Sequence, residues 1–160
     1  MAHEHHHEGP SGPALNRLAL SATLHCLTGC AIGEVLGMAI GTALHWGNLE
    51  TIALAVVLAF AFGYALTIRP LLRAKLPLKR ALGLAFASDT ASITVMEIVD
   101  NLIMLAIPGA MDAHIDNALF WASLAVALAI AGVAAYPVNR WLIARGKGHA
   151  VVMKHHQHHH

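Results

Sequence analysis

The sequence has few charged residues. Only 12% of its 160 residues are Asp, Glu, Lys or Arg, whereas 57% are hydrophobic. Ordinary soluble domains carry about twice that share of charge, so the composition excludes this class. It predicts an integral membrane protein.

Four apolar stretches are long enough for membrane spans, because about 20 apolar residues cross about 30 Å of hydrocarbon. We therefore predict an all-α polytopic membrane protein. Its transmembrane domain covers residues 15–145, between flexible His-rich tails at 1–14 and 146–160. The four predicted transmembrane helices are Leu15–Trp46, Leu49–Ile68, Ala81–Pro108 and Ala118–Arg140.

Lys and Arg are absent from two of the three predicted connections. All ten lie at the start of the first span, between the second and third, or from the last residue of the fourth onward, and these places share one side of a four-span protein. Because cytoplasmic loops are rich in Lys and Arg, both termini are predicted to be cytoplasmic. The N-terminus lacks the basic and short apolar regions of a cleavable signal. We expect a multi-pass protein of the bacterial inner membrane, without a nucleic-acid partner.

The two connections that lack Lys and Arg carry acids and histidines instead. They read HWGNLET and GAMDAHIDN. Loops are polar for ordinary reasons, and the alternative is that these side chains gather cations outside the membrane. The candidate residues for external capture are His45, Asp112, His114 and Asp116.

Ten of the 13 histidines lie at the two ends of the sequence. Two explanations stay open. The ends are in part purification tags, or they are native tracts whose imidazoles bind Zn, Cu, Ni or Co. The site predictions depend on neither.

Two patterns of four-residue spacing overlap in the first span. One is a polar ladder of Cys26, Cys30 and Glu34, with His25 on its flank. A disulfide between the two cysteines has poor geometry on one helix, and the spacing does not match haem attachment or a thioredoxin-like site. The other pattern is a stripe of glycines beside the ladder, which predicts a seam where another helix packs closely. The stripe consists of Gly29, Gly33, Gly37 and Gly41.

The third span carries three acids on one helical face. An Asp near the centre of a membrane helix costs about 2.5 to 3.5 kcal/mol, and no Lys or Arg lies in the interior of any span to neutralise these acids. A bound cation, protonation or a wet cavity must therefore satisfy them. The face comprises Asp89, Met96, Glu97, Asp100 and Met104, with Ser92 and Asn101 at its margins.

Depth along the two polar spans predicts which side chains meet. Spans one and three run in the same direction, so residues are matched by counting from their cytoplasmic ends. The matched groups are Cys30 with Met96, Glu34 with Asp100, and His25 and Cys26 with Asp89 and Ser92.

This mixture of soft and hard ligands favours a transition metal over Ca²⁺ or Mg²⁺, which prefer oxygen alone. Thiolates and imidazole suit Zn²⁺ or Cu(I). The predicted metal ligands are His25, Cys26, Cys30, Glu34, Asp89, Glu97 and Asp100, with Ser92, Met96, Asn101 and Met104 as secondary polar positions. In the alternative interpretation, the cysteines and methionines only pack and His25 bonds a carbonyl.

Three segments resemble a known family: LHCLTGCAIGEVLGMAIG, SDTASITVMEIVDN and YPVNRWLIARGKGHAV. They are similar to the small bacterial membrane proteins grouped as domain of unknown function 4396, and the resemblance covers Ala22–Val152. Its members are sometimes linked with copper proteins, but the family has no settled activity. The resemblance supports the four-helix fold. It also supports the choice of site residues, with matches at His25, Cys26, Cys30, Gly33, Glu34, Asp89, Glu97, Asp100 and Asn101.

Three functions remain in competition. The first is a membrane protein that binds and transports a transition metal, copper or zinc, as its cofactor or cargo. The second is a proton or monovalent-cation pathway through the buried acids, and the third is a structural subunit that assembles through the glycine seam. Four helices provide little wall for a transport route, so the first two functions imply a homo-oligomer or a partner protein in the bilayer. No hydrolytic arrangement of nucleophile and base is evident, and we do not expect an enzyme.

Overall fold

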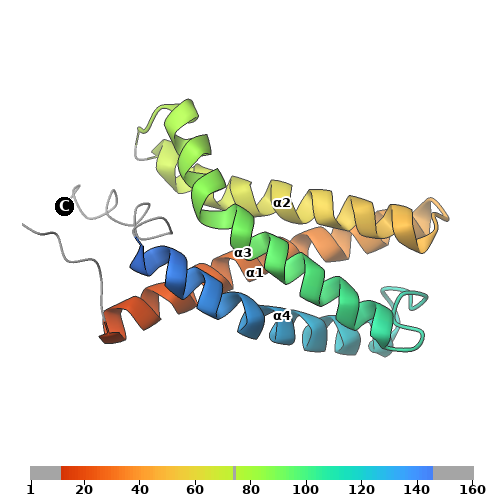
Figure 1. Ribbon diagram of the computed structural model, residues 1–160. Coiled ribbons are helices and arrows are strands. Elements are labelled where there is room, and N and C mark those ends of the chain that lie inside the picture. The colour runs from red at the N-terminus through yellow and green to blue at the C-terminus, as the bar shows by residue number, and fades with distance from the viewer. Residues whose placement is uncertain (1–11, 74, 146–160) are drawn as a thin grey trace, which may run out of the picture.

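The chain forms four long helices joined by short connections (Figure 1). The computed structural model describes residues 12–73 and 75–145. The helices are α1 (Gly12–Ala43), α2 (Asn48–Arg73), α3 (Leu78–Ala106) and α4 (Ala118–Ala144). All four are long and apolar enough to cross a membrane, judged by length and composition. The prediction of an all-α protein with four such helices is therefore confirmed.

The helix ends differ from the predicted ones by a few residues. α1 begins at Gly12, so residues 12–14 are helical and do not belong to a tail. Pro13 is tolerated there because the first turn of a helix has no partner for its N–H group. α1 ends at Ala43, before the predicted Trp46, and the backbone then turns through His45, which has a φ of 55°. The remainder of the two predicted tails lies outside the described residues.

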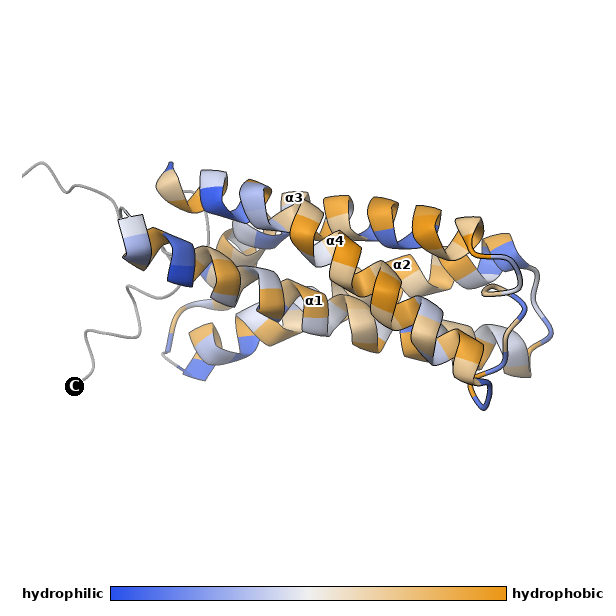
Figure 2. Ribbon diagram, turned by 90° about the horizontal axis from the view of Figure 1, so that it is seen from below, coloured by the Kyte–Doolittle hydropathy of each residue, from blue (hydrophilic) through white to orange (hydrophobic). Residues whose placement is uncertain are grey.

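The helices pack in a ring in which α1 contacts α2 and α4, and α3 contacts the same two helices. The α1–α2 and α3–α4 connections lie together at one end, which we call the loop end (Figure 1). The start of α1, the α2–α3 connection and the end of α4 lie at the other. We call it the basic end, because every Lys and Arg of the described residues belongs to it: Arg17, Arg69, Arg73, Lys75, Lys79, Arg80, Arg140 and Arg145. Figure 2 shows the largely hydrophobic stretch of helix between the two ends.

The predicted glycine seam is a real contact, and its partner is α2 of the same chain. A Cβ atom on Gly37, for example, would lie 2.6 Å from the Cα atom of Ala55. All four glycines of the seam face α2 in this way, and the pairs are Gly29 with Gly63, Gly33 with Ala59, Gly37 with Ala55, and Gly41 with Thr51. Such contacts let two helix backbones approach each other closely.

The four glycines do not all meet the same kind of neighbour. Gly29 and Gly33 lie against the backbone of α2, whereas Gly41, near the loop end, lies against the side chain of Thr51. α2 therefore packs against the glycine seam over its whole length. In this structure the seam is occupied by α2 of the same chain, and assembly with another subunit stays a prediction.

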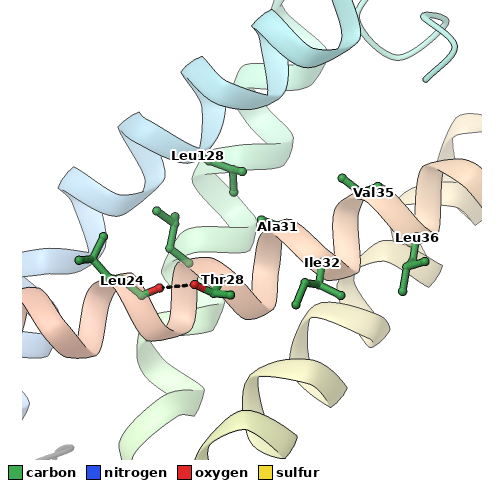
Figure 3. Close-up of a pocket in the computed structure, with 8 residues that line it drawn as sticks. Leu24, Thr28, Ala31, Ile32, Val35, Leu36 and Leu128 are labelled. Carbon is green, nitrogen blue, oxygen red and sulfur yellow. Dashed lines mark hydrogen bonds between the residues drawn. The ribbon is translucent and has the colours of Figure 1, made fainter. Parts of the chain in front are cut away.

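Large apolar side chains cover the outside of the bundle, as in a helix bundle that faces lipid. An open apolar groove of about 630 Å³ runs along α1 beside Leu128 of α4 (Figure 3). The Thr28 hydroxyl in this groove donates to the Leu24 carbonyl oxygen of its own helix, at 2.8 Å. The groove is lined almost entirely by apolar side chains and includes none of the polar site residues described below.

Candidate cation site

The acids of α3 point into the bundle, as the helical wheel predicts. The exposed fraction of the side chains is 4% for Glu97 and 1% for Asp100. Glu34 of α1 is also only 4% exposed. These three residues, called the acid cluster from here on, are therefore almost completely shielded from the surroundings of the protein.

Residues of α1 and α3 meet in successive pairs along the bundle axis, which we call rungs. Cys30 and Met96 form one rung, with 4.0 Å between their sulfur atoms. One turn nearer the loop end, the carboxyl groups of Glu34 and Asp100 lie close enough to interact electrostatically. Both contacts are the ones that the depth comparison predicts. Glu97 adjoins these rungs through its proximity to the Cys30 thiol.

The carboxyl groups of the acid cluster have few partners. Among the described residues, Glu34 Oε1, both carboxyl oxygens of Glu97 and both of Asp100 are buried without a hydrogen bond. No Lys or Arg occurs between Arg17 and Arg69 or between Arg80 and Arg140. A buried polar group without a partner lowers stability by about 1–3 kcal/mol, and a buried charge lowers it further. Protons, water or a cation are therefore needed to stabilise the acid cluster.

A second polar group lies nearer the basic end and makes hydrogen bonds between side chains. His25 Nε2 lies 3.0 Å from Thr67 Oγ1, and Ser88 donates to Asp89 at 2.7 Å. Asp89 also interacts with Thr67 and His25. Asp89 is 11 positions before Asp100 on α3, which corresponds to about 16 Å along a helix. This group, called the polar layer, is therefore separate from the acid cluster.

Asn139 connects α4 to the polar layer. Its Nδ2 group donates to Thr23 Oγ1 of α1 and to Ser92 Oγ of α3, at 2.9 Å in each case. The polar layer thus joins residues from all four helices. Neither Thr67 nor Asn139 is among the site residues predicted from the sequence. The sequence does contain a signal for Asn139. An amide within an otherwise apolar span needs a hydrogen-bond partner inside the protein.

Six of the seven predicted metal ligands therefore fall into two groups. Within residues 12–73 and 75–145, no three His, Cys, Asp or Glu side chains are arranged as a ready-made metal site. Cys30 and the acid cluster lie together, whereas His25 and Asp89 belong to the polar layer. Cys26 lies between the groups, close to Ser92 and Asp89.

The other candidate residues are also located. Asn101 donates to the Glu97 carbonyl oxygen of its own helix at 2.9 Å, which identifies a structural role for its amide. Met104 is buried. The candidate capture residues are all exposed in the connections at the loop end: His45, Asp112, His114 and Asp116.

The family of the chain follows from a comparison with protein-family models. The model described as domain of unknown function, DUF4396, matches residues 16–148, which is most of the chain. The chain belongs to this family. The DUF4396 match includes both the acid cluster and the polar layer, so both are parts of the family domain. No curated protein and no solved structure matches the chain. The DUF4396 description names no activity, and the function must be argued from the site.

Proposed function

We propose that this protein binds a transition-metal cation inside the membrane and carries it across the bilayer. The observation that carries the proposal is the rung of Cys30 and Met96 sulfurs directly beside three buried carboxyl groups with unpartnered oxygens. Sulfur ligands favour copper or zinc over Ca²⁺ and Mg²⁺. A bound cation would also offset part of the negative charge of the acid cluster, which has no Lys or Arg beside it. The proposed ligands are Cys30, Glu34, Met96, Glu97 and Asp100.

The positions of the ligands support entry from the loop end. Asp100 is six residues from the end of α3 at Ala106, or about 9 Å along the helix. The excess of Lys and Arg at the basic end supports a cytoplasmic location for that end. In this orientation, the exposed acids and histidines of the loop end meet the cation first. Since four helices enclose little space, we propose that a homo-oligomer forms the complete route.

The metal content of the purified protein tests this proposal. The terminal histidines must not obscure the result, so the full-length chain carries Ala in place of the ten histidines in residues 1–11 and 149–160. We call it the end-substituted protein. It should retain about one Cu or Zn per chain, measured by mass spectrometry after desalting. Glu97→Gln and Asp100→Asn should each weaken binding at least about tenfold, because even outer partners of a metal site contribute that much.

Glu50→Gln is the matched control, because Glu50 is an exposed acid at the start of α2. This variant should bind metal as tightly as its parent. Metal binding that survives both Glu97→Gln and Asp100→Asn, or no binding by the end-substituted protein, would contradict the proposal.

A proton pathway is the second candidate function. The unpartnered carboxyl oxygens favour it, because a protonated carboxyl group can donate a hydrogen bond to a neighbouring carboxylate. In proteoliposomes with an imposed membrane potential, the end-substituted protein would then conduct protons without added metal. Asp100→Asn would abolish this flux, and Glu50→Gln would not. The absence of proton flux in the parent protein excludes this candidate.

A further inference from the structure

Beyond the acid cluster, toward the loop end, α1 and α3 each carry one more sulfur-containing residue at the same four-residue spacing. We call these two four-residue series, Cys30–Glu34–Met38 on α1 and Met96–Asp100–Met104 on α3, the ladders. Met38 lies one turn past Glu34 on α1, and Met104 lies one turn past Asp100 on α3. Their exposed fractions are only 4% and 2%. Met111, from the α3–α4 connection, packs against the separate apolar clusters that contain Met38 and Met104. Sulfur residues therefore lie on both sides of the Glu34–Asp100 rung.

The spacing of these residues is that of the helix itself. Cys30, Glu34 and Met38 are four residues apart on α1, as are Met96, Asp100 and Met104 on α3. Four residues rise about 6 Å along a helix. The order along the bundle is therefore a Cys–Met rung, a Glu–Asp rung and then Met38 on α1 and Met104 on α3, each about 6 Å further along its helix and each in its own apolar cluster. The four methionines of the described residues, at 38, 96, 104 and 111, all belong to this region.

Ligand chemistry separates the two metals of the proposed function. Zinc sites in proteins use nitrogen, thiolate and oxygen ligands rather than thioethers. Thioether ligands select Cu(I). Three methionine thioethers and the Cys30 thiol lie one turn from the Glu34–Asp100 rung on the same helices, with Cys30 and Met96 on one side and Met38 and Met104 on the other. This donor set suits a soft cation of low charge better than a divalent one.

We infer that the site selects a soft monovalent cation, Cu(I) or its analogue Ag(I), over Zn²⁺, and that the sulfur groups on either side of the acid rung determine this selectivity. The inference rests on the proposed function and specifies its cargo. Methionine often fills irregular gaps in a core, but leucine has a similar volume and usually replaces it at small cost. Met→Leu variants therefore remove the sulfur ligand while they preserve packing.

The test measures Ag(I) and Zn²⁺ binding by the end-substituted protein in chloride-free detergent buffer. Ag(I) should bind at about one per chain and at least about tenfold more tightly than Zn²⁺. Met96→Leu should weaken Ag(I) binding at least about tenfold and leave Zn²⁺ binding within about twofold. The double variant Met38→Leu/Met104→Leu tests the other side of the acid rung and should have the same effect. Met111→Leu is the matched control, because Met111 is outside the two ladders, and it should bind Ag(I) like the parent.

The outcomes distinguish this inference from the proposed function. If Zn²⁺ binds as tightly as Ag(I), or if neither methionine variant affects Ag(I), the inference is wrong and the cation site of the proposed function stands. An equal loss in Met111→Leu also overturns the assignment to the ladders. If neither metal binds, both proposals fail. Size-exclusion elution and thermal unfolding check that each variant is folded, and the two variants on opposite sides of the acid rung provide independent tests.

Discussion

Asn139 illustrates how one polar side chain can connect a bundle of apolar helices. Its amide donates to hydroxyl groups on α1 and α3, and its exposed fraction is only 2%. The Thr23 hydroxyl in turn donates to the Ala19 carbonyl oxygen. Thr23 can therefore accept the bond from Asn139 without leaving its own hydrogen unsatisfied. This arrangement explains why an amide is tolerated in a helix that is otherwise almost entirely apolar.

Asn139→Ala should reduce the free energy of unfolding by about 1–2 kcal/mol, because two buried hydrogen bonds between helices are lost. Unfolding of the detergent-solubilised protein by increasing SDS measures this change. Asn16→Ala is the control: Asn16 is exposed and only accepts a bond from Arg140, so the expected change is below about 0.5 kcal/mol. Equal stability of the two variants would show that the polar layer does not hold the helices together.

At the scale of the element, α1 presents two neighbouring faces that repeat every fourth residue. One face is the glycine seam, which packs on α2. The other face carries the ladder of Cys30, Glu34 and Met38 toward α3. The close approach of α2 fixes how α1 is rotated, and this rotation aims the ladder at α3. The residues of α2 that meet the seam also recur every fourth position: Thr51, Ala55, Ala59 and Gly63.

Gly33→Leu should destabilise the fold by at least about 3 kcal/mol, because the new side chain meets the backbone of Ala59, which cannot give way. The expected result is little monodisperse protein after detergent extraction. Gly83→Leu is the matched control within α3, since a Cβ atom at Gly83 has no neighbour within 4 Å. Normal yield and elution of Gly33→Leu would contradict the role of the seam.

At the scale of the whole molecule, the bundle has one basic end and one end without Lys or Arg. The acid cluster lies between them but closer to the loop end, and the polar layer lies closer to the basic end. The two ends of the molecule therefore differ both in surface charge and in the buried polar residues that lie nearest to them. In the proposed function, with the basic end cytoplasmic, the cation would enter from outside beside the acid cluster and would leave past the polar layer.

Cysteine labelling in intact cells or spheroplasts tests the orientation. Lys75→Cys, in the α2–α3 connection at the basic end, should react with a membrane-impermeant maleimide only after the membrane is opened. His114→Cys, in the exposed α3–α4 connection, should react without opening. The native Cys26 and Cys30 are buried and should remain unlabelled in the folded protein. Labelling of Lys75→Cys from outside would reverse the proposed orientation and the direction of entry.

The sequence by itself determined the four helices, the inward face of α3 and the glycine seam of α1, because these depend on the spacing of residues within one helix. It also identified the pairs Cys30–Met96 and Glu34–Asp100, since parallel helices that begin at similar heights bring equal depths together. Only the tertiary structure decided that α2 fills the seam and that the predicted ligands separate into an acid cluster and a polar layer. The role of Asn139 was likewise decided there. Spacing along one helix does not specify which neighbour lies opposite each face, and the hydrogen bonds of Thr67 and Asn139 depend on those neighbours.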